Sequence, residues 1–148
     1  MEGEGQVEEI IVDASVIAKW YIIEEPRENA LKIRDDYIDG RIRLSAPFLM
    51  PFEVLNAVRY ARKDISPTAS IKVAESLTLY GIKLCELRGE YARETVETAL
   101  ENEITIYDAS YVALAKVLST VMYTSDQDLI TKLKDNYKSY IKHLEDYK

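Results

Sequence analysis

Hydrophobic residues along the chain fall into two alternating patterns. Short runs rich in β-branched residues, such as EIIV at positions 9–12, are typical of buried strands. Between these runs, apolar residues recur every three or four positions, which predicts helices. The predicted strands are residues 9–12, 43–46, 82–87, 120–123 and, at one edge of the sheet, 139–144. The predicted helices are residues 26–39, 53–61, 67–80, 89–100, 109–118 and 127–135.

Proline, serine and glycine mark several of the helix ends. Ser66 precedes Pro67, an arrangement in which the serine caps the helix and the proline occupies its first position. Gly81 follows the last residue of the same helix, and Gly40 ends the helix that Pro26 begins. Strands therefore alternate with helices along the whole chain. This order predicts a three-layer α/β/α fold with a mostly parallel sheet of four or five strands and a ligand site at their carboxyl ends.

The length and composition indicate one folded domain. The chain has 148 residues, of which 47% are hydrophobic and 30% charged, and it contains no repeat or low-complexity linker. We expect residues 1–8 to form a flexible tail and residues 9–148 to form the domain. The acidic start and the lack of a long apolar run predict a cytoplasmic protein without a membrane segment. The single cysteine, Cys85, cannot form an internal disulfide.

The charge of the chain limits the ways in which it can act on nucleic acid. The formal net charge is −7, whereas a protein that coats nucleic acid carries a basic face. Chemistry on phosphate would therefore need positive charge from another source. Metal ions bound by carboxylates would supply it, and a basic protein partner would also complement an acidic surface.

Four acidic residues follow strands or begin helices in this predicted order. Asp13 and Asp126 come directly after strands, whereas Glu53 and Asp108 lie near the first turns of helices. In a parallel α/β fold all four can converge on one edge of the sheet. Mg²⁺ and Mn²⁺ prefer oxygen ligands, so no histidine or cysteine cluster is needed. The one histidine, His143, is expected to be a surface or packing residue, which disfavours zinc.

The position of each acid also has an ordinary structural explanation. An aspartate can form a turn, an acid in a first turn interacts well with the helix dipole, and an aspartate can cap a helix. Clustered carboxylates would repel one another, and bound cations would relieve that repulsion. Two ions about 4 Å apart could then activate a water and stabilise a leaving oxygen. Position alone leaves both the metal site and the structural roles open.

Four stretches of the sequence resemble the PIN-domain ribonucleases, in particular the VapC-type toxins of toxin–antitoxin pairs. They are residues 11–20 (IVDASVIAKW), 51–57 (PFEVLNA), 107–115 (YDASYVALA) and 123–129 (YTSDQDL). Each stretch has modest specificity, but their ordered combination is specific and spans nearly the whole chain. The resemblance implies that Asp13, Glu53, Asp108 and Asp126 bind Mg²⁺ or Mn²⁺ for cleavage of single-stranded RNA. It also implies a homodimer and a cognate antitoxin, for which a basic segment would suit this acidic protein.

Five further positions are candidates for supporting roles. Ser15 matches a hydroxyl that the family places beside the first acid, and Thr124 or Ser125 could orient a metal-bound water. These hydroxyls could equally cap turns. Asn56 lies one turn after the second acid and is a candidate to support it, or else a surface amide. Asp128 is either an additional metal ligand or simply the start of the next helix.

The sequence also suggests two surface features and leaves two other functions open. Arg59, Arg62 and Lys63 could contact RNA phosphates or form a solvated helix face, and residues 20–22 form either a partner-binding apolar patch or part of the core. One alternative function is a PIN-like module that binds RNA or protein without cleaving it. Another is a Mg²⁺-dependent phosphatase, which the sequence disfavours because Ser15 stands where a haloacid-dehalogenase-like phosphatase has its second aspartate.

Overall fold

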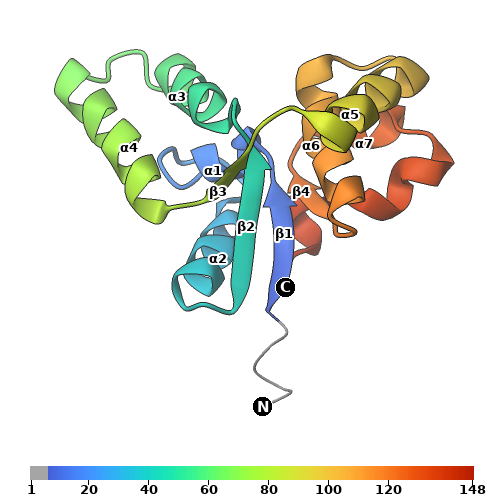
Figure 1. Ribbon diagram of the computed structural model, residues 1–148. Coiled ribbons are helices and arrows are strands. Elements are labelled where there is room, and N and C mark those ends of the chain that lie inside the picture. The colour runs from blue at the N-terminus through green and yellow to red at the C-terminus, as the bar shows by residue number, and fades with distance from the viewer. Residues whose placement is uncertain (1–6) are drawn as a thin grey trace.

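A parallel sheet forms the centre of the computed structural model, which describes residues 7–148 (Figure 1). Within that range the sheet has five strands in the order β3-β2-β1-β4-β5, and every neighbouring pair is parallel. The strands are β1 (Glu8–Val12), β2 (Ile42–Pro47), β3 (Lys83–Cys85), β4 (Met122–Thr124) and β5 (Ile141–His143). The predicted parallel sheet is confirmed.

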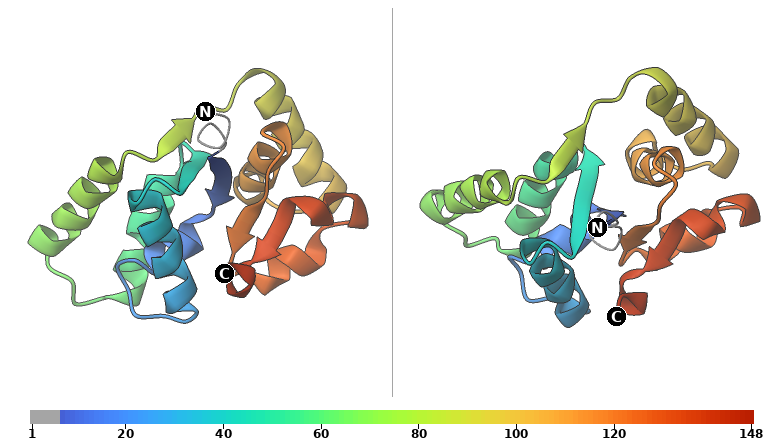
Figure 2. Two further views of the ribbon diagram at one scale, coloured as in Figure 1. Left: turned by 90° about the horizontal axis from the view of Figure 1, so that it is seen from below. Right: turned by 60° about the horizontal axis from the view of Figure 1, so that its bottom comes forward.

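Helices lie on both sides of this sheet. Helices α1 to α4, coloured blue to green, lie on one side, and α5 to α7, coloured yellow to red, lie on the other (Figures 1 and 2). Two 3₁₀ helices, η2 (Asp135–Tyr140) and η3 (Leu144–Asp146), flank β5. The α-helices are α1 (Ala14–Ala18), α2 (Arg27–Ile38), α3 (Met50–Ala61), α4 (Pro67–Tyr80), α5 (Gly89–Asn102), α6 (Ile106–Val117) and α7 (Gln127–Lys132). The three-layer α/β/α architecture is confirmed.

The central strand β1 is buried on both faces. The exposed fractions of Ile10, Ile11 and Val12 are 1% or less. Where a strand is covered on both faces, its residues point into the core in alternating directions, so the consecutive residues 10–12 of β1 are all apolar. This explains why the strand reads in the sequence as a continuous hydrophobic run.

The order of the strands brings distant parts of the chain together at the carboxyl end of β1. The chain passes from β1 to β2 and β3 on one side and later returns to β4 on the other side. Val12, the last residue of β1, is paired in register with Tyr123 of β4. The strand order therefore changes direction between β1 and β4, and in parallel sheets such a position is where ligands bind.

Helix α4 has the predicted bounds because its ends carry strong local signals. The Ser66 side chain accepts a hydrogen bond from the backbone N–H of Ala69 at 3.1 Å and so caps the first turn. Gly81 ends the helix at φ 65°, in the left-handed region that glycine adopts without a steric penalty.

Two helices begin earlier than predicted, in both cases before an acidic residue of the site. Helix α3 begins at Met50, with Pro51 in its first turn, where the missing N–H of proline does no harm. Helix α6 begins at Ile106, because the Thr105 side chain caps it by accepting a hydrogen bond from the backbone N–H of Asp108 at 3.0 Å. Both helices were predicted to begin three residues later.

The last predicted elements differ more from the structure. The predicted strand 139–144 is only three residues long, because η2 occupies the preceding positions. Helix α7 ends at Lys132 and not at Asp135. His143, the last residue of β5, caps η3, since its Nδ1 accepts the backbone N–H of Glu145 at 3.0 Å.

Residues 20–22 belong to the core and do not form a partner-binding patch. The exposed fractions of Trp20 and Ile22 are 5% and 7%. The Trp20 indole N–H donates to the backbone oxygen of Ala30 at 2.9 Å, and its ring packs against Tyr80 with 4.9 Å between the ring centroids. A buried indole with a satisfied N–H is typical of a core tryptophan.

The N-terminal prediction falls mainly outside the described residues. Of the predicted tail, positions 1–6 are not described, and strand β1 begins at Glu8. In the part of the chain that the structure does describe, no helix has both the length and the apolar character required to cross a membrane.

Candidate active site

Asp13 connects the end of β1 to helix α1, which the sequence pattern did not predict. The Asp13 side chain caps this helix, and its Oδ1 accepts the backbone N–H groups of Ser15 and Val16 at 3.0 and 3.3 Å. The same oxygen accepts the Ser15 hydroxyl at 2.5 Å, and the Thr124 hydroxyl of β4 donates to Oδ2. The carboxyl group is therefore held from α1 on one side and from β4 on the other.

Burial makes ionisation of Asp13 unfavourable. Its exposed fraction is 9%, and desolvation raises its pKa although four hydrogen bonds from neighbouring groups act in the opposite direction. A carboxylate that is desolvated in this way is stabilised by a nearby positive charge. The environment of Asp13 is therefore one in which a bound cation would be favourable.

Glu53 lies in the first turn of α3 and faces the same region. The Tyr111 hydroxyl of α6 donates a hydrogen bond to Glu53 Oε1 at 2.7 Å. Burial raises the pKa of Glu53, and the negative charges of Asp13 and Asp108 raise it further. These charge effects require the three acids to lie near one another, although 95 residues separate the first from the last along the chain.

Asp108 and Asp126 complete the acidic group. Asp108 lies in the first turn of α6, and its pKa is raised by burial and then by the charge of Asp126. Asp126 caps α7, and its Oδ1 accepts the backbone N–H of Leu129 at 3.2 Å. Its own N–H donates to the Thr124 hydroxyl at 3.0 Å, so Thr124 contacts both Asp13 and Asp126.

The four predicted acids line one pocket at the carboxyl edge of the sheet. The pocket has a volume of about 170 Å³. It is lined by Asp13, Ala14, Ser15, Glu53, Asp108, Tyr111, Asp126 and Leu129. The structure thus brings together side chains from the ends of β1 and β4 and from the first turns of α3 and α6.

The donor set of this pocket suits a hard divalent cation that keeps part of its water shell. Across residues 7–148 no three histidine, cysteine, aspartate or glutamate side chains are arranged to hold one ion directly. Mg²⁺ commonly binds through only one or two carboxylates, with waters and substrate phosphate as its remaining ligands. The four carboxylates therefore fit such an ion, whereas an all-protein cage of the zinc type is not formed by the described residues.

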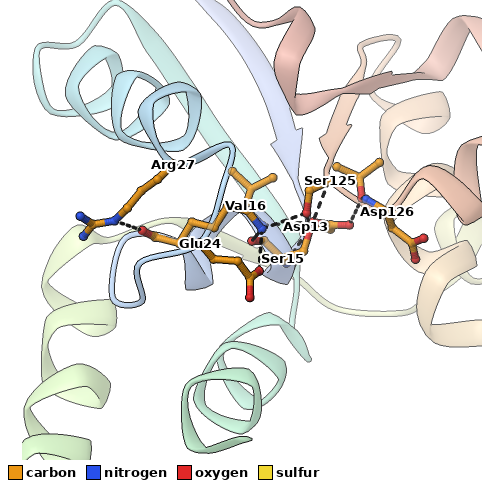
Figure 3. A network of polar contacts seen from close by, with 9 residues as sticks. Asp13, Ser15, Val16, Glu24, Arg27, Ser125 and Asp126 are labelled. Carbon is orange, nitrogen blue, oxygen red and sulfur yellow. Dashed lines mark hydrogen bonds and ion pairs between the residues drawn. The ribbon is translucent and has the colours of Figure 1, made fainter. Parts of the chain in front are cut away.

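Three of the five predicted supporting residues contact the site. Ser15 and Thr124 both donate to Asp13, and Ser125 contacts Ser15 through its backbone N–H at 3.3 Å and its hydroxyl at 3.0 Å. Figure 3 shows Asp13 in this network, between Ser15 of α1 and the residues that follow β4. Asp128 is exposed and does not line the pocket. Asn56 is exposed and lines a neighbouring hollow.

This neighbouring hollow adjoins the carboxylate pocket, since both are lined by Glu53. Its volume is about 620 Å³. Phe52 and Tyr107 lie in it with 77% and 62% of their surface exposed, and Arg59 adds a positive charge. Single exposed apolar residues are common, but two exposed aromatic side chains that line the same hollow form a patch of the kind found at binding surfaces. The complete lining is Leu49, Phe52, Glu53, Leu55, Asn56, Arg59 and Tyr107.

Two residues at the site were not among the predicted candidates. Tyr111 lies three residues after Asp108, a spacing that places both on one helix face, so its position could have been inferred. Lys19 donates from Nζ to the Ser125 hydroxyl at 3.0 Å and is buried. The signal for Lys19 was weaker, because a lysine that follows an apolar run is normally placed at the surface.

The fold and the pocket define a class of protein. The sequence profile of the PIN domain family matches residues 10–135, and the chain belongs to this family. Within the family it is similar to Ribonuclease VapC3 from Pyrobaculum aerophilum, with 29% identity over 126 residues that cover 83% of this chain and 93% of that protein. The resemblance inferred from the four motifs is therefore confirmed.

Solved structures show the same fold. The crystal structure of PAE2754 from Pyrobaculum aerophilum superimposes with a TM-score of 0.63 and 26% identity, covering 94% of this chain and 85% of that one. The structure of FitAB bound to an IR36 DNA fragment gives a TM-score of 0.61 at 16% identity, covering 91% of this chain and 94% of that one. The second similarity supports the fold alone.

Proposed function

We propose that this protein is a metal-dependent endoribonuclease that hydrolyses phosphodiester bonds of single-stranded RNA, and that it is the toxin of a VapBC-type pair. The observation that carries the proposal is the pocket in which Asp13, Glu53, Asp108 and Asp126 meet. A relative that is named a ribonuclease and aligns over most of the chain supports the same activity.

The four carboxylates would hold Mg²⁺ or Mn²⁺, which supplies an activated water and neutralises charge on the phosphodiester. The hydrogen bonds from Ser15 and Thr124 keep Asp13 in one orientation, and the Tyr111 hydroxyl does the same for Glu53. Without a cation, the desolvated acids would repel an RNA phosphate. Cleavage is therefore expected to depend strictly on divalent ions.

The hollow beside Glu53 supports a single-stranded substrate. Unstacked bases can pack on exposed aromatic rings, as Phe52 and Tyr107 would allow, while a phosphate could meet Arg59. Bases in a duplex are stacked on one another and cannot reach such rings. Arg62 and Lys63 are also exposed and lie just beyond the end of α3, the helix that carries Arg59.

The proposed partners follow from the surface of the protein. The net charge of −7 suits an antitoxin with a basic segment. Helix α4 exposes Ile71 and Leu79, with exposed fractions of 59% and 86%, and such apolar residues fit a protein contact with the antitoxin or within a homodimer. A toxin neutralised in this way would act in the cytoplasm.

Cleavage of a labelled single-stranded RNA tests the proposal. We expect internal cuts with Mg²⁺ or Mn²⁺ and none with EDTA. Asp13→Asn and Asp108→Asn should each lower the rate about 100-fold or more, because each removes charge that holds the ion. Asp64→Asn is the matched control, since Asp64 is exposed in the turn between α3 and α4, and it should cleave at the wild-type rate. Undiminished cleavage by both site variants would overturn the proposal.

A second candidate function is a PIN module that binds RNA or protein without cleaving it. The observation in its favour is that no three ligating side chains among residues 7–148 are arranged to hold one ion directly. Calorimetry separates the two functions. Titration of the wild-type protein with Mn²⁺ should show binding that Asp13→Asn abolishes, whereas a non-cleaving module would bind RNA equally well with and without the ion.

A further inference from the structure

Lys19 is a buried lysine one residue beyond the end of α1. Only 2% of its side chain is exposed, and its Nζ contacts three oxygen atoms. These are the backbone oxygen of Ser15 at 3.2 Å, Glu24 Oε1 at 3.1 Å and the Ser125 hydroxyl at 3.0 Å. An ammonium group has three hydrogens and accepts none, so each hydrogen of Lys19 has one acceptor.

The contact between Lys19 and the Ser125 hydroxyl fixes the direction of a chain of hydrogen bonds that ends on Asp13. Because Lys19 can only donate, the Ser125 hydroxyl accepts from it and is left with one hydrogen to donate to the Ser15 hydroxyl, 3.0 Å away. The Ser15 hydroxyl in turn donates to Asp13 Oδ1 at 2.5 Å. Figure 3 shows Asp13, Ser15 and Ser125 joined in this network. Both serine hydroxyls of this chain therefore donate in the direction of the Asp13 carboxylate.

The fold alone does not require a lysine at this position. Burying an ammonium group costs free energy, and Glu24, with 58% of its side chain exposed, compensates it only in part. A methionine has a similar length and would fill the space without that cost. The backbone of Lys19 is also held independently, since Arg27 Nε donates to its carbonyl oxygen at 2.9 Å. The charged group of Lys19 is thus better explained by what it orients.

We propose that Lys19 is a positioning residue for the carboxylate pocket. By directing the Ser125 and Ser15 hydroxyls toward Oδ1, it holds Asp13 in the orientation that receives a divalent cation. It also links α1 to the turn after β4, two segments 106 residues apart. This inference rests on the proposed metal-dependent function, and it assigns to Lys19 an effect on metal affinity and not on the chemical step itself.

Calorimetric titration of the RNA-free protein with Mn²⁺ tests this role. We expect Lys19→Met to weaken Mn²⁺ binding about tenfold, the low end of the range for residues that orient metal ligands. Ser125→Ala cuts the same chain while keeping the lysine, so it should weaken binding to a similar extent. The double variant should be no weaker than either single one, because the two residues act through one chain. Lys32→Met is the matched control, since Lys32 forms a half-exposed ion pair with Asp36, and its affinity should stay at the wild-type value.

Amide hydrogen exchange of the metal-free protein gives a second reading that needs no metal. The backbone N–H groups of Ser15 and Val16 donate to Asp13 Oδ1, and that of Ser125 donates to the Ser15 hydroxyl. Lys19→Met and Ser125→Ala should speed exchange at these amides and leave the exchange rates in helix α4 unchanged.

The outcomes separate this inference from the proposed function. Faster exchange in the variants of a protein whose wild-type form binds no Mn²⁺ would support the orientation of Asp13 by Lys19, but it would refute the metal-dependent nuclease and with it the effect of Lys19 on metal affinity. Wild-type Mn²⁺ affinity and unchanged exchange in both variants would overturn the role of Lys19 while the nuclease stands. If Lys19→Met does not fold, Ser125→Ala decides by the same two measurements.

Discussion

Thr124→Val removes one hydroxyl from the centre of the site with little change of shape. Thr124 is fully buried and donates to Asp13 Oδ2, and it also accepts the backbone N–H of Asp126 at 3.0 Å. Valine keeps the branched side chain, so packing is preserved. The loss that matters is the donor to Asp13, because Asp13 has only 9% of its surface exposed, whereas Asp126 is exposed and water can replace its lost partner.

Thr124→Val should lower the free energy of unfolding by about 2 kcal/mol at pH 8. Leaving one buried group without its hydrogen-bond partner costs about 1–3 kcal/mol, and the cost is higher when the group is charged. For a domain of this size, 1 kcal/mol lowers the melting temperature by about 2–4 °C, so Thr124→Val should lower it by about 4–8 °C.

The loss of stability in Thr124→Val should be greater at high pH than at low pH. Burial already raises the pKa of Asp13 in the folded protein, and the Thr124 hydroxyl opposes that rise. Without the hydroxyl the folded pKa rises further, so ionised Asp13 destabilises the variant more than the wild type. This difference is largest above the folded-state pKa values of both proteins and disappears below them, because Asp13 is then protonated in both folded states and the unfolded state is the same for both.

Urea unfolding of the metal-free proteins in EDTA at pH 8 and pH 4.5 measures this effect. The difference in free energy of unfolding between wild type and Thr124→Val should be smaller at pH 4.5 than at pH 8, while the slope of the unfolding free energy against urea concentration stays the same. Thr131→Val is the control, because Thr131 is exposed on α7 and its hydroxyl bonds only to its own helix. A difference that is equal at both pH values, or absent at pH 8, would refute the assignment of Thr124 to ionised Asp13.

Two further predictions concern the acids and the neighbouring hollow. Asp108→Asn should stabilise the metal-free protein by about 0.5 kcal/mol at pH 8, a value reduced for its partial exposure, because burial and Asp126 raise the Asp108 pKa and make its charge unfavourable. Thermal unfolding in EDTA from pH 8 to pH 4 measures the gain, which should shrink as the pH falls; a lower melting temperature than wild type at pH 8 would contradict it. Phe52→Ala should weaken RNA binding about tenfold by loss of base stacking, while Mn²⁺ affinity is retained. Fluorescence anisotropy with labelled RNA checks this, and equal RNA affinity would exclude Phe52 from the substrate path.

The sequence predicted those features that depend on local signals or on the rules of parallel sheets. The Ser66–Pro67 start and the Gly81 end defined α4, since capping and positive φ are local properties. The convergence of Asp13 and Asp126 also followed from the sequence, because the carboxyl ends of neighbouring parallel strands meet at one edge.

Other features depend on contacts between distant residues, and the sequence did not reveal them. Helix α1 is too short for a periodic pattern and exists because Asp13 caps it. Tyr111 bonds to Glu53 across 58 positions, and Lys19 bonds to Ser125 across 106, so neither pair leaves a local signal. Such pairs become visible only when the tertiary structure brings their elements together.

The central claim is that the four carboxylates form a binding site for divalent cations. Anomalous diffraction from crystals soaked in Mn²⁺ tests it most directly, because the signal locates the ion without any assumption about the reaction. The account predicts an anomalous peak in the pocket between Asp13, Glu53, Asp108 and Asp126, and no peak there in Asp13→Asn crystals. A pocket that stays empty at saturating Mn²⁺ in the wild-type protein would contradict the account.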